Sequence, residues 1–174
     1  MLYLMDIDGT VVRSFMRESG GGAAQEYDLV EVLPGRRAAL DQLSADGHAV
    51  ALVTNQGGVA FGYQTQDQVI AKMMRICEAL GLPVSEAKWG ADNLGPASVY
   101  VSFGHPQARV AEWRTDPDDD WRKPGGGMIV EAIRDYRVDK GRTVFVGDRA
   151  SDEQAAVAAG VVYIDAVEFF GPGA

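Results

Sequence analysis

Short apolar runs of four to six residues recur along the chain, separated by longer stretches with helical spacing. The runs cover residues 2–5, 49–54, 97–102, 143–146 and 161–164. Runs of this length without polar alternation are typical of strands that helices cover on both faces. The pattern therefore predicts five buried strands.

Apolar residues between these runs repeat at the spacing of an amphipathic helix. Four helices are predicted, within residues 34–46, 65–80, 128–136 and 155–159. The second begins with a capping box, Thr65-x-x-Gln68, and ends before Gly81. Because strands and helices alternate, we expect one α/β domain over 1–174, with a doubly wound, mainly parallel sheet in a three-layer arrangement.

Composition narrows the class of protein. The chain has 174 residues, with 16 Lys and Arg against 25 Asp and Glu, so the net charge is −9. This acidity makes a nucleic-acid partner unlikely without excluding it, because phosphate contacts need positive charge. One cysteine allows no internal disulfide. With no apolar run near the ~18 residues of a membrane span, and no signal peptide, we expect a cytoplasmic protein without a membrane partner.

Polar residues follow three of the predicted strands at their carboxyl ends. Asp6 and Asp8 follow the first strand, Thr54-Asn55-Gln56 ends the second, and Asp148 follows the fourth. Ligands of open α/β sheets bind outside this edge, so these groups are expected to form one site.

The three acids define the chemistry of that site. Clustered carboxylates repel one another unless a cation neutralises them, and Mg²⁺ prefers such oxygen ligands. Thr54, the backbone N–H groups that follow it and Lys123 would add hydrogen-bond donors and positive charge. The predicted set of Asp6, Asp8 and Asp148 around Mg²⁺ therefore suits phosphoryl transfer.

Four segments in order resemble the motifs of the haloacid dehalogenase (HAD) superfamily. They are Asp6-Ile7-Asp8-Gly9-Thr10, Thr54-Asn55-Gln56, Arg122-Lys123-Pro124 and Gly147-Asp148-x-x-x-Asp152. The second and third look most like the histidinol-phosphate and heptose-bisphosphate phosphatase group (subfamily IIIA). The resemblance implies a Rossmann-like phosphatase fold. Only 38 residues separate Thr10 from Ala49, which predicts a capless protein with an open site.

The resemblance also assigns roles to the residues. Asp6 would be the nucleophile that forms an aspartyl-phosphate, and Asp8 the acid and base. Thr54, Asn55 and Gln56 would bind the substrate with Arg122 and Lys123, and Lys123 would neutralise the phosphate. The Mg²⁺ ligands would be Asp6, the main chain of Asp8, and Asp148, with Asp152 beside them.

One departure bears on the substrate. Heptose-bisphosphate enzymes typically bind zinc through three Cys and one His in the loop before Arg-Lys-Pro. Here that stretch reads Ser102-Phe103-Gly104-His105-Pro106 and later Asp119-Asp120-Trp121, so no structural zinc is expected. The expected substrate is a small phosphorylated metabolite of carbohydrate metabolism, such as a sugar bisphosphate resembling heptose 1,7-bisphosphate, or histidinol phosphate.

Two other functions stay open. A polynucleotide 3′-phosphatase has a similar Thr-Asn-Gln segment and would suit an open site. A non-enzymatic phospho-accepting switch would share the sheet, an acceptor Asp, Mg²⁺ and a Lys. Asp8, two residues after the acceptor, favours hydrolysis. The loops 13–32 and 104–121 would determine specificity, and the sequence makes no prediction of oligomeric state.

Overall fold

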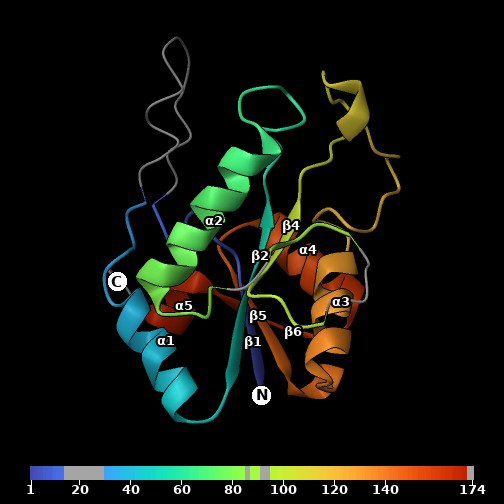
Figure 1. Ribbon diagram of the computed structural model, residues 1–174. Helices are drawn as coiled ribbons and strands as arrows, with labels where there is room; N and C mark the ends of the chain where they lie inside the picture. Colours follow the sequence, from blue (N-terminus) through green and yellow to red (C-terminus); the bar gives the residue numbers. More distant parts are fainter. Residues whose placement is uncertain (14–29, 85–86, 91–94, 172–174) are drawn as a thin grey trace.

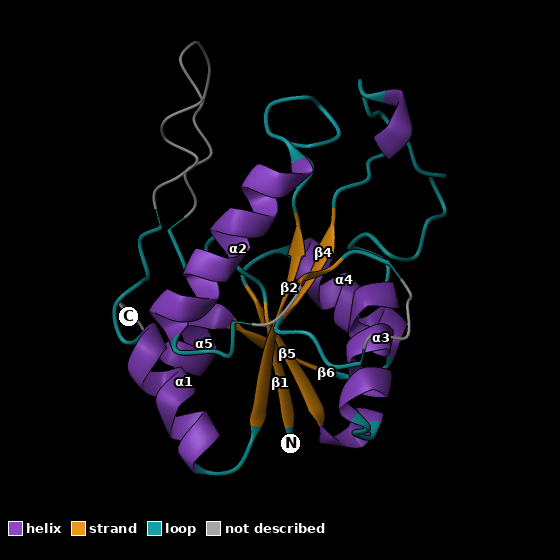
Figure 2. Ribbon diagram, in the orientation of Figure 1, coloured by secondary structure: helices purple, strands orange, loops and turns teal. Residues whose placement is uncertain are grey.

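Six strands form one sheet in the order β3-β4-β2-β1-β5-β6, and every pairing is parallel (Figures 1 and 2). The computed structural model describes residues 1–13, 30–84, 87–90 and 95–171. The strands are β1 Leu2–Met5, β2 Ala49–Asn55, β3 Ala87–Lys88, β4 Val99–Ser102, β5 Thr143–Gly147 and β6 Val162–Asp165. The parallel sheet confirms the predicted fold class.

Helices cover both faces of this sheet (Figure 1). One layer holds α1 Arg36–Ala45, α2 Gln66–Leu80 and α5 Ala166–Phe170. The other holds α3 Gly127–Tyr136 and α4 Ala150–Ala159. Side chains of β1 pack against both layers of helices. Leu2 and Leu4 pack toward α3 and α4, and Met5 packs toward α1 and α2. The predicted three-layer arrangement is thereby confirmed.

One strand and one α-helix were not predicted, and another strand differs from its prediction. β3 and α5 have two and five residues, too few to produce a periodic pattern. β6 was expected to be covered on both faces, but Val162 is 54% exposed. That prediction is wrong: β6 lies at one edge of the sheet, and none of its four residues is buried.

The connections add little beyond these elements. The described residues contain no cap domain, and residues 14–29 of the first predicted loop lie outside the described residues. Among the helices of the described ranges, none is long and apolar enough to cross a lipid bilayer.

A buried ionic cluster joins α3 to the strands beneath it. Lys88 Nζ lies 2.6 Å from a Glu131 oxygen and 2.8 Å from an Asp135 oxygen, and all three side chains are almost fully buried. The Tyr100 hydroxyl also donates to Asp135, at 3.0 Å. The cluster fixes the rotation of α3, the helix that follows Lys123 in the chain.

Candidate active site

The predicted site residues converge at the carboxyl edge of the sheet, where β2, β1 and β5 are neighbours. Asp6 follows β1, Thr54 and Asn55 end β2, and Asp148 follows β5. The Asp6 backbone N–H donates to Val146 at 2.8 Å, so the ladder between β1 and β5 continues into the site. The sheet register therefore sets the spacing of these side chains.

Three carboxylates form the acidic part of the site. Oxygens of Asp6, Asp148 and Asp152 lie within 4.8 Å of one another. Asp6 and Asp152 are buried, whereas Asp148 is partly exposed. The Asp8 side chain, which the sequence placed near the acids, is not in this group and instead accepts a hydrogen bond from Gln56. The side-chain cluster thus contains Asp152 where Asp8 was expected.

Lys123 is the cation of the site and is 4% exposed. Its ammonium contacts Asp6, lies 2.7 Å from Asp152 Oδ1 and donates to the Val53 carbonyl at 3.2 Å. The other Asp152 oxygen accepts from the Arg149 N–H at 3.1 Å, at the start of α4. Asp152 therefore both caps a helix and fixes Lys123.

Burial and neighbouring charges shift the ionisation of these groups. Desolvation raises the pKa of Asp6 to about 7, although Lys123 opposes the shift. Burial also raises the pKa of Asp148. Burial alone would lower the pKa of Lys123, but the charges of Asp6 and Asp152 hold it above its ordinary value. Lys123 thus stays an ammonium, while Asp6 and Asp148 keep their protons to higher pH than exposed carboxyl groups do.

Two glycines allow the acids to approach the backbone. A Cβ at Gly9 would lie 2.3 Å from Asp148 Oδ2, and a Cβ at Gly147 would lie 2.5 Å from the Asp152 Cβ. Gly9 also has a φ of 93°, in the left-handed region that favours glycine. The turn after Asp8 and the end of β5 therefore require glycine.

The amides that follow Thr54 make contacts within the site. Asn55 holds the Lys123 backbone by two hydrogen bonds. The Asn55 Nδ2 donates to the Lys123 carbonyl at 2.8 Å, and the Lys123 N–H donates to the Asn55 Oδ1 at 3.1 Å. Gln56 donates to Asp8 and to Thr54. Asn55 and Gln56 were predicted to bind substrate through their backbone N–H groups, and their side chains bond to neighbouring protein groups.

Arg122 lies at the rim of the site. Its Nη1 donates to the Gly104 carbonyl at 3.0 Å. The same Nη1 lies close to Gly57, where an added Cβ would be 3.6 Å from it. Burial lowers the pKa of this guanidinium. Arg122 thus joins the loops that follow β2 and β4, beside the site.

The loop expected to lack zinc is held by hydrogen bonds. The Trp121 indole N–H donates to the Val101 carbonyl at 3.0 Å, and the Trp121 backbone N–H donates to Asp119 at 3.0 Å. His105 Nδ1 accepts from the Gln107 N–H at 3.0 Å. These residues close the loop with protein contacts, and the absence of zinc stays a prediction.

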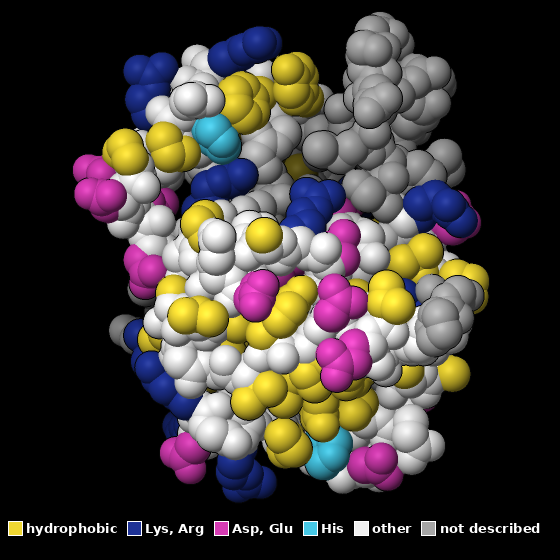
Figure 3. Space-filling view, turned by 180° about the vertical axis from the view of Figure 1, so that it is seen from behind, with side chains coloured by type: hydrophobic (Ala, Val, Ile, Leu, Met, Phe, Trp, Pro, Cys, Tyr) yellow, Lys and Arg dark blue, Asp and Glu magenta, His cyan; other side chains and the backbone are white. Residues whose placement is uncertain are grey.

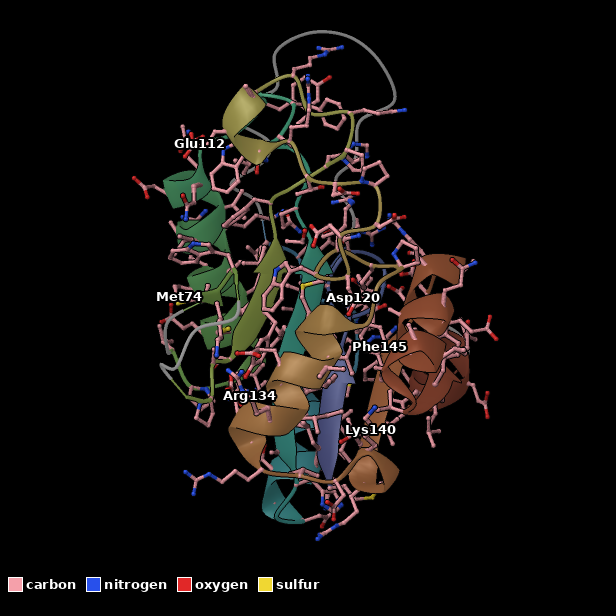
Figure 4. The ribbon with its side chains drawn as sticks, turned by 90° about the vertical axis from the view of Figure 1, so that its right-hand side faces the viewer. Met74, Glu112, Asp120, Arg134, Lys140 and Phe145 are labelled. Atoms are coloured by element: carbon pink, nitrogen blue, oxygen red, sulfur yellow. The ribbon has the colours of Figure 1, made fainter. Side chains whose placement is uncertain are left out.

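The glycine run after Pro124 lies against backbone from two other parts of the chain. A Cβ at Gly125 would lie 2.3 Å from the Asp120 carbonyl oxygen, and one at Gly126 would lie 2.8 Å from the Ala159 nitrogen. The Asp120 carboxylate accepts from the Gly126 N–H at 2.8 Å, at the beginning of α3 (Figure 4). The run is therefore closely packed, and it fixes the segment that carries Lys123.

The acidic cluster fits a divalent cation. Its donors are all carboxylate oxygens, which are hard ligands, and burial raises the pKa values of Asp6 and Asp148. Figure 3 shows Lys and Arg side chains on the upper part of the molecule seen from behind, with others at its lower end. The site can thus hold a cation and receive an anionic group.

Known phosphatases are similar to this chain over most of its length. The model of the polynucleotide kinase 3 phosphatase family matches residues 1–165. D-glycero-beta-D-manno-heptose-1,7-bisphosphate 7-phosphatase from Escherichia coli (strain K12) is 34% identical over 158 residues, covering 90% of this chain and 73% of the relative. The Haemophilus influenzae protein of the same name is 29% identical over 157 residues, covering 90% and 76%.

A solved structure extends the similarity to the fold. D,D-heptose 1,7-bisphosphate phosphatase from B. bronchiseptica, complexed with magnesium and phosphate, matches with a TM-score of 0.65 and 28% identity, covering 93% of this chain and 78% of that one. Fold, site and relatives together define a phosphatase of the HAD type. The chain belongs to the polynucleotide kinase 3 phosphatase family.

Proposed function

We propose that the protein is a Mg²⁺-dependent phosphomonoester hydrolase that acts on a small phosphorylated sugar, with heptose 1,7-bisphosphate as the first candidate. The observation that carries the proposal is the buried contact of Lys123 with Asp6, beside the carboxylates of Asp148 and Asp152. The heptose-bisphosphate phosphatases, similar over 90% of the chain, support the substrate class.

Asp6 and Asp8 would perform the chemistry in two steps. An Asp6 oxygen bonds to phosphorus while the bond to the leaving oxygen breaks, and that oxygen takes a proton from Asp8. Asp8 then takes a proton from water, whose oxygen attacks phosphorus and releases Asp6. Each cycle returns both acids to their starting states.

The remaining residues would bind and orient the phosphoryl group. Thr54 and the Asn55 backbone N–H would donate to its oxygens, and Lys123 would hold Asp6 and neutralise charge. Asp6, the Asp8 carbonyl and Asp148 would hold Mg²⁺. When bound, Mg²⁺ would stabilise the negative charge that develops on the phosphoryl oxygens.

The substrate can be tested with a panel. In Mg²⁺, we expect kcat/KM for heptose 1,7-bisphosphate to be at least about tenfold higher than for histidinol phosphate or for an oligonucleotide with a 3′-phosphate. EDTA should abolish phosphate release from heptose 1,7-bisphosphate. Fastest turnover of the oligonucleotide would instead support a polynucleotide 3′-phosphatase, as the family description suggests. No turnover of any of the three would contradict the proposal.

Magnesium affinity is expected to rise with pH. Asp6 has a pKa raised to about 7 by burial, so below that pH a proton competes with the cation. The apparent affinity should fall by up to about tenfold per pH unit below pH ~7 and level off above it. Thermal-shift titrations with Mg²⁺ between about pH 6 and pH 8 measure this.

The raised pKa of Asp6 also determines how the stability of the metal-free protein changes with pH. A raised pKa means that folded Asp6 keeps its proton where unfolded Asp6 has lost it, so its contribution to stability is present at low pH and is lost as pH rises through about 7. The stabilisation by Mg²⁺ should therefore be larger at about pH 8 than at about pH 6. Equal shifts at both pH values would contradict the raised pKa.

A further inference from the structure

The Gln56 side chain lies between two groups that the mechanism uses differently. Its Nε2 donates to Asp8 Oδ2 at 2.9 Å and to Thr54 Oγ1 at 3.0 Å, and the residue is 8% exposed. Its backbone N–H donates to the Ser102 carbonyl at 2.8 Å, at the end of β4. A single amide NH₂, anchored to the sheet, thus uses both of its hydrogens inside the site.

These bonds determine which atoms of Thr54 and Asp8 can donate a hydrogen. A threonine hydroxyl has one hydrogen, and because Thr54 Oγ1 accepts from Gln56, its own hydrogen stays free to donate to a phosphoryl oxygen. Asp8 Oδ2 already faces an N–H hydrogen, so a proton on that oxygen would oppose the donor. The proton that Asp8 transfers therefore belongs on Oδ1.

We infer that Gln56 is a positioning residue for the acid step rather than a substrate-binding residue: it holds Asp8 with Oδ1 as the proton-carrying oxygen and keeps the Thr54 hydroxyl a donor. The inference rests on the proposed function, because it assigns Asp8 as the acid. Proton donation matters most when the leaving oxygen is basic, so the role of Gln56 should depend on the leaving group.

The test compares leaving groups in the full-length protein with saturating Mg²⁺. Gln56→Met keeps the length of the side chain but removes the NH₂ group. We expect kcat/KM to fall less than about tenfold for 2,4-dinitrophenyl phosphate and by about 10²-fold or more for phenyl phosphate, the range of general acid catalysis. Because kcat/KM reports steps only up to departure of the leaving group, hydrolysis of the aspartyl-phosphate does not obscure the comparison.

Two controls separate this role from a structural one. Gln42→Met removes a similar bond, from Nε2 to Asp46 at 3.0 Å on the exposed side of α1, and should leave kcat/KM unchanged for both substrates. In an Asp8→Ala background, Gln56→Met should no longer make kcat/KM depend more strongly on the leaving group, because the acid that Gln56 positions is gone. Gln56→Glu, which keeps the shape of the side chain, replaces Gln56→Met if that variant does not fold.

The outcomes distinguish this inference from the proposed function. An equal loss for both substrates, no loss at all, or an added leaving-group dependence in the Asp8→Ala background would overturn the role of Gln56. If the native protein hydrolyses neither phosphate in Mg²⁺, the proposed function itself fails. A loss that grows with the basicity of the leaving group, and that needs Asp8, supports the inference.

Discussion

Replacing Asp6 with asparagine is expected to lower kcat by at least about 10⁴-fold, because the amide cannot form the aspartyl-phosphate that the proposed mechanism requires. Asparagine is nearly the same size, so the packing around β1 should be kept. The variant also loses one carboxylate beside Asp148 and Asp152. Phosphate release in Mg²⁺ measures the effect, and circular dichroism checks the fold.

Asp41→Asn is the matched control for this variant. Asp41 lies on α1, where it pairs with Arg37 at 2.9 Å, and about half of its side chain is exposed. The same chemical change there should leave kcat within about twofold, because exposed helix pairs contribute little. Turnover by Asp6→Asn above about a tenth of the native rate would refute the nucleophile assignment.

Replacing Lys123 with methionine should destabilise the protein by about 3–5 kcal/mol, the usual cost of removing one partner of a buried ion pair. Methionine fills much of the volume but leaves Asp6 and Asp152 buried without this ammonium. Urea unfolding in EDTA measures the loss. Mg²⁺ should restore part of the stability by neutralising the acids, but not the activity.

Lys140→Met provides the comparison. Lys140 is exposed and lies in the turn before β5, toward the end of the sheet opposite the site (Figure 4). Its replacement should change stability by less than about 0.5 kcal/mol, as is usual for surface positions. A loss below about 1 kcal/mol for Lys123→Met would show that the buried acids do not depend on this cation.

Local pattern was sufficient for the main elements of the fold. The runs that became β1, β2, β4 and β5 are apolar on both faces, and the Thr65 capping box closes at the start of α2. These signals lie within a few residues of one another, so a single sequence carries them. β3 was missed because a two-residue strand has no period.

The sequence pattern did not predict contacts between residues that are far apart in the chain. The cation beside Asp135 and Glu131 is Lys88, more than 40 positions earlier in the chain, and nothing around Lys88 distinguishes it from a surface lysine. Asp152 was expected beside the metal ligands. Its pairing with Lys123 depends on how α4 packs against the segment before α3. Such pairs form only when the layers are assembled.

The sequence by itself determined that acids would follow β1 and β5 and that Thr54 would end β2, because strand ends can be recognised from apolar runs that stop at polar residues. Only the tertiary structure decided which oxygens meet: it grouped Asp152 with Asp6 and Asp148, and it turned the Asp8 side chain toward Gln56. The physical reason is that side-chain direction at a strand end depends on the neighbouring loops, whose contacts come from other parts of the chain.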